Sequence, residues 1–354
     1  MNKNICIANK NINSKSSVFI IAELSANHLQ NFDNAVKLIK EAKKSGADAV
    51  KLQTYTPDTI TLNCDNKYFQ IKQGTIWDGT ILYKLYEKAY TPWEWQPKLK
   101  NIAEAEGLIC FSSPFDKSAV DFLEKMNVPA YKIASFEITD IPFIEYVASK
   151  GKPVIMSTGI AKLGDIQEAM DACRRVGNND IILLKCTSEY PSPLEDINLN
   201  TIPNMCDTFD VITGISDHTL GQTVSLGAVA LGAKVVEKHF TLKRADGGPD
   251  AAFSMEPEEF SYMVKGIRDM EKALGNVSYE LTEKQIKSRE HSRSLFVVKD
   301  MKAGEVFTEE NVKSIRPGFG LKTKYIDDVL GKKARYDIDR GTPMEWSLID
   351  YYCS

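Results

Sequence analysis

Short apolar runs alternate with longer amphipathic segments along the chain as far as Leu274. The runs are rich in Val, Ile and Ala, as buried parallel strands are, whereas the segments between them repeat apolar residues every three or four positions, as helices do. From this pattern we predict eight strands: Val18–Glu23, Ala49–Gln53, Leu108–Ser112, Ala130–Ile133, Pro153–Ser157, Ile181–Lys185, Val211–Ile215 and Val235–His239.

Helix-like segments follow most of these strands. The helix after the second strand is predicted to open with Thr91 as its cap and Pro92 in its first turn. The other predicted helices are Phe32–Ser45, Lys117–Met126, Ile141–Ser149, Leu163–Val176, Val224–Leu231 and Met255–Leu274. Eight strand–helix units in about 275 residues favour a (β/α)8 TIM barrel. A doubly wound open sheet is the alternative, but the chain has no Gly-rich dinucleotide loop.

The pattern changes after Leu274. Residues 276–291 are polar and are predicted to form a linker between a barrel domain, 1–275, and a small β-rich domain, 292–354. Turn signals in the small domain separate three strand-like pieces: Ser294–Val298, Val312–Ile315 and Met344–Ser347. Within the barrel, residues 57–90 form a long insertion after the second strand, and loops of that length are usually functional.

Composition narrows the functional classes. The net charge of −4 argues against a nucleic-acid partner, which normally meets a basic surface. The chain has no run of 18 consecutive apolar residues, so we expect no membrane-spanning helix. The seven cysteines lack CxxC spacing, which is typical of reduced thiols in a cytoplasmic protein.

Polar side chains gather at the carboxyl ends of the predicted strands, where barrel enzymes carry their active sites. Two histidines, His218 and His239, end neighbouring strands, so their imidazoles can share one divalent metal. The remaining candidates at strand ends are Glu23, Lys51, Gln53, Lys132, Ser135, Ser157, Ser188, Tyr190, Ser216, Asp217 and Glu237. The lysines and hydroxyls suit a small doubly charged anion such as phosphoenolpyruvate.

Less specific interpretations of these residues remain open at this point. Glu237 can be a structural ion-pair partner of Lys132 or Lys51. Asp217 can bind the metal, or it can orient His218 by accepting a hydrogen bond from its ring. The separate acid, base and orienting roles of Glu23 and Glu237 do not follow from spacing.

These residues, in this order, resemble the sialic acid synthase family over nearly the whole chain. The resemblance rests on a string of short motifs: Ile21-Ala22-Glu23, Lys51-Leu52-Gln53-Thr54, Lys132-Ile133-Ala134-Ser135, Ser157-Thr158-Gly159, Tyr190-Pro191, Ser216-Asp217-His218-Thr219, Glu237-Lys238-His239 and Gly248-Pro249-Asp250. It implies condensation of phosphoenolpyruvate with an open-chain amino sugar, using Mn²⁺ or Mg²⁺ on His218 and His239. It also adds Asp250 to the substrate-binding residues.

The last part of the chain resembles the antifreeze-like (SAF) domain of the same family. The motif Ile315-Arg316-Pro317-Gly318 carries this likeness, and it implies a domain-swapped homodimer in which Arg316 reaches the sugar site of the partner. The opening Leu24-Ser25-Ala26, Ser188 and the aromatic residues Tyr55, Trp77 and Tyr83 look like the pseudaminic acid synthase branch. That branch implies a 6-deoxy diacetamido sugar as substrate.

Rival functions remain. Within the family these are N-acetylneuraminate and legionaminate synthases. Outside it they are a non-catalytic sugar-binding or ice-binding protein and a metal-free aldolase barrel with a Schiff-base lysine, which metal analysis and borohydride trapping would distinguish.

Overall fold

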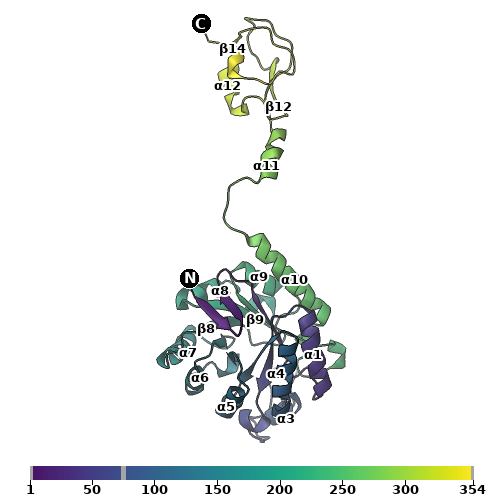
Figure 1. The fold of residues 1–354 in the computed structure, drawn as a ribbon, viewed down its shortest axis with the longest axis vertical. Coiled ribbons are helices and arrows are strands. Elements are labelled where there is room, and N and C mark those ends of the chain that lie inside the picture. Colours follow the sequence, from purple (N-terminus) through teal and green to yellow (C-terminus); the bar gives the residue numbers. More distant parts are fainter. Residues whose placement is uncertain (1–2, 73–76, 352–354) are drawn as a thin grey trace. The chain divides into compact units, whose positions relative to one another are not determined.

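The computed structural model describes residues 3–72 and 77–351, and the chain divides into two compact units, Met1–Gly275 and Asn276–Ser354. The first unit is a closed barrel of eight parallel strands, surrounded by helices (Figure 1). Around the barrel the strands are β10 (Val235–His239), β3 (Phe19–Glu23), β4 (Ala49–Thr54), β5 (Ile109–Pro114), β6 (Tyr131–Ile133), β7 (Val154–Ser157), β8 (Ile181–Cys186) and β9 (Ile212–Asp217). The predicted barrel is confirmed, and the open sheet is excluded.

Helices of the first unit connect these strands and cover the barrel. They are α1 (Phe32–Lys44), α2 (Pro57–Ile60), α3 (Leu82–Ala89), α4 (Gln96–Ala105), α5 (Lys117–Lys125), α6 (Ile141–Ala148), α7 (Leu163–Arg175), α8 (Thr201–Phe209), α9 (Thr223–Ala230) and α10 (Pro257–Leu274). The apolar strand residues pack inside the barrel or under the helices, and Phe111, Tyr131 and Phe260 are among the largest side chains that are fully buried. None of the described helices is long and apolar enough to cross a membrane.

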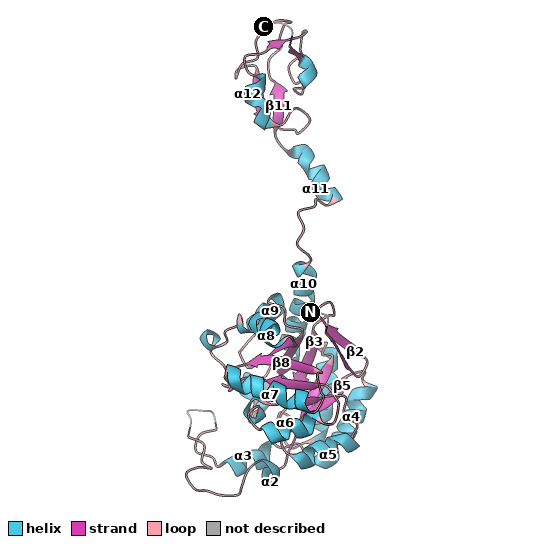
Figure 2. Ribbon diagram, turned by 90° about the vertical axis from the view of Figure 1, so that its left-hand side faces the viewer, coloured by secondary structure: helices cyan, strands magenta, loops and turns pink. Residues whose placement is uncertain are grey.

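Several elements of this unit were not predicted. The hairpin of β1 (Asn4–Ile7) and β2 (Lys10–Asn13) buries Ile5, Ile7 and Ile12 in the same core as the strand residues. Helix α8 precedes β9. The insertion contains α2 and α3, which lie at the end of the barrel opposite the hairpin (Figure 2); residues 73–76 of the insertion are outside the described part.

The predicted start of the helix after the second barrel strand, which is α4 in the structure, is wrong. Pro92 precedes a short 3-10 helix, Trp93–Trp95, and α4 begins only at Gln96. Thr91 does not cap because its hydroxyl lies 3.0 Å from His28 Nε2 and its carbonyl accepts a hydrogen bond from the side chain of Gln96. These contacts tie the loop to the barrel instead of starting a helix.

The second unit is small and contains short strands around its own apolar core. Its helices are α11 (Glu283–Ser288), which falls within the predicted linker, and α12 (Ile326–Val329). Its strands are β11 (Ser294–Val297), β12 (Val312–Ile315), β13 (Lys333–Ala334) and β14 (Ile349–Asp350). The predicted strand Met344–Ser347 is wrong: Met344 is fully buried in the core, a 3-10 helix spans Trp346–Leu348, and the strand follows at β14.

Candidate active site

A cavity of about 470 Å³ opens at the carboxyl ends of the barrel strands. This is the end at which barrel folds collect side chains from many loops. The predicted site residues that line it are Glu23, Lys51, Gln53, Lys132, Ser135, Ser157, Ser188, Tyr190, Ser216, His218, Glu237, His239 and Asp250. Residues that are far apart in the sequence therefore meet in one site.

The floor of the cavity is a buried network of charges. Lys51 Nζ lies 2.7 Å from Glu23 Oε2 and 2.8 Å from Glu237 Oε1. Lys132 Nζ approaches the same oxygen of Glu237 at 3.3 Å, and the Ser216 hydroxyl donates to it at 3.1 Å. Burying charged groups away from water costs free energy, so a buried charge network indicates a role in binding a ligand or in specifying the structure. The two ammonium groups, from β4 and β6, provide a site for an anion.

Burial and charge act against each other on these groups. Burial lowers the pKa of Lys51 to about 7, although Glu237 acts to raise it. Burial alone would raise the pKa of Glu237, but Lys132 and Lys51 outweigh that effect and hold its pKa well below the usual range. Glu237 is therefore ionised at neutral pH, whereas the pKa of Lys51 lies close to neutral pH, so this lysine can gain or lose its proton there.

Several buried polar atoms that line the cavity have no hydrogen-bond partner in the described part of the chain. They are Glu137 Oε2, Ser157 Oγ, Ser188 Oγ, Glu237 Oε2 and His239 Nδ1. Leaving a buried polar group unpaired costs about 1–3 kcal/mol, so folded proteins rarely collect such groups without a ligand or water to pair them. The cavity is thus prepared to receive a polar molecule.

The two imidazoles face each other across the end of neighbouring strands, with ring centroids 5.3 Å apart. His218 Nδ1 lies 2.9 Å from the Thr187 carbonyl, to which it donates, so its other ring nitrogen keeps a lone pair. Burial lowers the pKa of His239 well below its usual value and keeps that ring neutral. Burial acts to lower the pKa of His218 as well, but the neighbouring Cys186 thiol outweighs that effect and raises it. Neutral imidazole is the form that binds divalent transition metals, so His239 fits the predicted metal directly, and His218 fits it through its second ring nitrogen once that ring is neutral.

No group of three or more His, Cys, Asp or Glu side chains within residues 3–72 and 77–351 is arranged to hold a metal. A metal at His218 and His239 would therefore take its remaining ligands from water and substrate. That open coordination is typical of catalytic sites.

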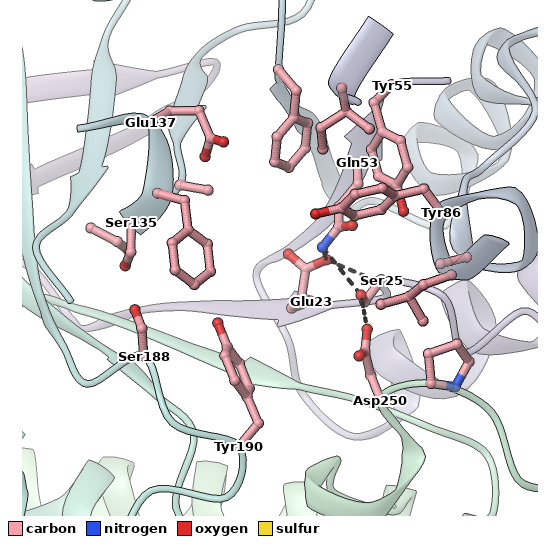
Figure 3. A pocket seen from close by; sticks show the side chains of 18 of the residues that line it. Glu23, Ser25, Gln53, Tyr55, Tyr86, Ser135, Glu137, Ser188, Tyr190 and Asp250 are labelled. Atoms are coloured by element: carbon pink, nitrogen blue, oxygen red, sulfur yellow. Dashed lines mark hydrogen bonds between the residues drawn. The ribbon is translucent and has the colours of Figure 1, made fainter. Parts of the chain in front are cut away.

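A second polar cluster lies beside the charged floor (Figure 3). Gln53 Nε2 donates to Glu23 Oε1 at 3.3 Å and to Ser25 Oγ at 3.1 Å, and the Ser25 hydroxyl donates to Asp250. The Ser25 backbone N–H also donates to Glu23 at 2.9 Å. The cluster presents hydroxyl, amide and carboxylate groups together, which is the set that hydrogen-bonds a polyhydroxylated molecule.

Glu137 was missed by the sequence analysis. It ends the 3-10 helix Ser135–Glu137 after β6 and lines the cavity on the side opposite Tyr86 (Figure 3). Burial raises its pKa to about 7. The available signal was its place two residues beyond Ser135, but only the helical turn after the strand brings it into the cavity.

Two candidate residues are not brought into this cavity. Arg316 belongs to the second unit, where it is exposed beside β12. Asp217 lies on the outer face of β9, where Lys238 Nζ contacts it at 2.9 Å and the hydroxyls of Thr219 and Ser225 donate to it. The catalytic assignment of Asp217 is therefore withdrawn, and it does not contact His218 either.

The Asp217–Lys238 pair instead stabilises the barrel. Both side chains are fully buried, so Asp217→Ala leaves an unpaired ammonium group in the protein interior. We expect this change to lower the free energy of unfolding by about 3–5 kcal/mol in urea denaturation. Asp171→Ala, which breaks a half-exposed pair with Arg174, is the matched control and should cost at most about 1 kcal/mol. Equal losses in the two variants would show that the buried pair adds nothing.

The fold and the site together are those of a TIM-barrel enzyme whose cavity suits a small anion, and the comparisons with known proteins show its family. The NeuB family matches residues 38–279, and the SAF domain matches residues 292–350. The chain belongs to the NeuB family, which confirms the resemblance predicted from the sequence.

Particular relatives narrow the position within the family. The chain is 48% identical to the pseudaminic acid synthase of Campylobacter jejuni subsp. jejuni serotype O:23/36 (strain 81-176) over 95% of this chain and 98% of that protein. It is 47% identical to the pseudaminic acid synthase of Helicobacter pylori over 92% of this chain and 96% of that protein. Among solved structures, the N-acetylneuraminic acid synthetase of Leptospira borgpetersenii superposes with a TM-score of 0.72 at 30% identity, covering 81% of this chain and 95% of that one.

Proposed function

We propose that this protein is a pseudaminic acid synthase. It condenses phosphoenolpyruvate with 2,4-diacetamido-2,4,6-trideoxy-L-altrose, releases phosphate and forms a nine-carbon 2-keto sugar acid, acting in the cytoplasm as a carbon–carbon bond-forming transferase. The observation that carries the proposal is the cavity itself, which combines lysine ammonium groups and serine hydroxyls on its floor with two imidazoles. The near full-length similarity to two pseudaminic acid synthases supports the choice of sugar.

Phosphoenolpyruvate binds on the cavity floor in this proposal. Lys51 and Lys132 supply the positive charge, and the hydroxyls of Ser135, Ser157 and Ser216 complete the hydrogen bonds. The unpaired Ser157 hydroxyl gains a partner when the anion enters. Lys51 has two carboxylate partners, whereas Lys132 shares only Glu237 with it, so an incoming anion gives Lys132 a charge partner of its own.

The sugar binds above this floor, against the polar cluster of Ser25, Gln53 and Asp250 and the rim residues Ser188 and Tyr190. A Mn²⁺ or Mg²⁺ ion on His218 and His239 would polarise the aldehyde of the sugar. Carbon C3 of phosphoenolpyruvate then bonds to the aldehyde carbon, water adds at C2, and the C–O bond to phosphate breaks.

The two carboxylates of the floor take different roles in this reaction. Glu237 remains ionised and faces the developing positive charge at C2, which it stabilises. Glu23 accepts hydrogen bonds from Gln53 and the Ser25 backbone on one oxygen, so it orients the sugar or the attacking water. Glu137, with its raised pKa, holds a proton near neutral pH and can donate it to a sugar oxygen.

The test of this function is phosphate release from phosphoenolpyruvate with a panel of open-chain amino sugars. Turnover with the diacetamido trideoxy sugar, and little with N-acetylmannosamine, is the expected result. Efficient turnover of N-acetylmannosamine would move the chain to the neuraminate branch.

One observation favours a second candidate function, a Schiff-base aldolase. The pKa of Lys51, lowered by burial to about 7, is what such a lysine needs. However, Lys51 is held between two carboxylates that favour its charged form. Irreversible inactivation by borohydride in the presence of substrate would support the aldolase.

We also propose that the enzyme is a homodimer in which Arg316 completes the site of the partner. Arg316 is exposed, and its position in the Arg-Pro-Gly motif has no evident packing role. Mixing inactive His239→Ala chains with inactive Arg316→Ala chains should restore roughly a quarter of wild-type activity, because half of the dimers are mixed and each has one intact site. A monomer in sedimentation, or no recovery in verified mixed dimers, would contradict the shared site.

A further inference from the structure

The cavity has an aromatic wall that the proposed chemistry does not use. It consists of Tyr55, which follows β4, Phe115, which follows β5, and Tyr86 on α3. The ring centroids of Tyr55 and Phe115 are 5.2 Å apart, those of Tyr55 and Tyr86 are 5.5 Å apart, and both pairs meet edge to face. Such pairs form a continuous, well-packed apolar surface.

Tyr55 and Tyr86 of this aromatic wall lie across the cavity from the hydroxyls of Ser135 and Ser188 (Figure 3). The insertion supplies much of it, because Tyr86 comes from α3, and Ile60 of α2 and Leu82 of α3 line the same region. The barrel itself does not need these residues to close. Their effect is to give one end of a polar cavity an apolar lining.

The hydroxyls of Tyr55 and Tyr86 form no hydrogen bond to another group of the described chain. Burial raises the pKa of both phenols, so they stay neutral at physiological pH. The wall therefore carries no charge of its own and presents ring carbon together with two neutral phenol hydroxyls (Figure 3). A methyl group suits the rings, whereas a hydroxymethyl group keeps its hydrogen bonds there only if a phenol replaces water, which Tyr86→Phe tests.

We propose that Tyr55, Phe115 and Tyr86 form an apolar subsite that receives the methyl end of a 6-deoxy sugar and selects it over sugars with a hydroxyl at that carbon. This inference rests on the proposed function and names the feature that sets its sugar preference. The reacting aldehyde lies at the other end of the sugar, beside the imidazoles. The subsite thus contacts the part of the sugar that takes no part in bond formation.

The test compares kcat/KM for two sugars that differ only at C6: the 2,4-diacetamido-2,4,6-trideoxy sugar and its 6-hydroxy counterpart. We expect the wild-type enzyme to prefer the 6-deoxy sugar roughly 10- to 100-fold, which is the range that an apolar pocket achieves for such a difference. Phe115→Ala and Tyr86→Ala should each reduce this preference at least several-fold. The KM for phosphoenolpyruvate should not change, because none of the three wall residues is among the proposed ligands of phosphoenolpyruvate.

Two further variants separate the ring from other effects. Tyr83→Ala removes a tyrosine from the same helix as Tyr86, but its hydroxyl bonds Asp58 at 3.1 Å and it does not line the cavity, so the preference should remain. Tyr86→Phe keeps the ring and should retain the preference. If Tyr86→Phe lost it as fully as Tyr86→Ala, the hydroxyl would be the determinant and the apolar subsite would be wrong.

The outcomes distinguish this inference from the proposed function. If the wall variants still release phosphate and keep the wild-type ratio of kcat/KM for the two sugars, the subsite alone is overturned. No phosphate release from any sugar in the wild-type enzyme overturns the synthase function itself.

Discussion

The His239→Ala enzyme should fold normally, bind phosphoenolpyruvate as before and turn over about 100- to 1000-fold more slowly, as enzymes do when one electrostatic contact to the reacting group is removed. The reason is the geometry of the imidazole pair. His239 is neutral, has an unpaired buried nitrogen and faces His218 at 5.3 Å between ring centroids. Steady-state kinetics with saturating Mn²⁺ would measure the effect.

Metal removal gives the same result without a substitution. Chelation with EDTA should abolish turnover, and Mn²⁺ should restore it. The matched control for His239→Ala is His291→Ala, because His291 is exposed in the second unit and should be replaceable without loss of turnover. Full activity of metal-free protein would refute the metal site.

The Lys132→Met enzyme should bind phosphoenolpyruvate more weakly by about 2–5 kcal/mol, the usual loss for one partner of a buried charge pair. Lys132 is 2% exposed and shares Glu237 with Lys51, so methionine keeps the packing and removes only the charge. Isothermal titration with phosphoenolpyruvate would measure the loss directly.

The control for this change is Lys152→Met. Lys152 pairs with Glu124 at 2.7 Å in a partly exposed position away from the cavity, so its charge does not serve the anion. Binding of phosphoenolpyruvate should therefore be unaffected. If Lys132→Met also left the affinity unchanged in folded protein, the assignment of the floor as the anion site would fail.

The barrel could be predicted because its strands are buried on both faces. Such strands appear in the sequence as continuous apolar runs, and several of these runs carry, at or near their ends, a polar residue that enters the active site. Lys51, Ser157 and His239 were all found in this way. The N-terminal hairpin was missed because its strands are short and alternate exposed with buried residues, a weak signal in four residues.

Asp217 shows how a small error in a strand boundary changes a functional assignment. The apolar run predicts a strand that ends at Ile215, after which Ser216, Asp217 and His218 share one loop. The strand in fact continues to Asp217, so successive side chains alternate between its two faces. Ser216 then points into the cavity and Asp217 points out to Lys238.

The aromatic wall and Glu137 lie beyond what strand patterns predict. Of the three aromatic residues that the sequence singles out, Tyr55 and Trp77 line the cavity but Tyr83 does not. Tyr86, one helical turn further along, takes that place. Only the orientation of α3 decides which of the two tyrosines faces inward. Helix orientation depends on packing between segments, which a local pattern does not contain.

The proposed function requires that the enzyme joins C3 of phosphoenolpyruvate to a sugar aldehyde. The most direct measurement is carbon NMR of the product formed from phosphoenolpyruvate labelled with ¹³C at C3, with the diacetamido trideoxy sugar as co-substrate. We expect the labelled carbon to become a methylene group bonded to the former aldehyde carbon, with one phosphate released for each bond formed. Label recovered as the methyl group of pyruvate, or left in unreacted phosphoenolpyruvate, would contradict it.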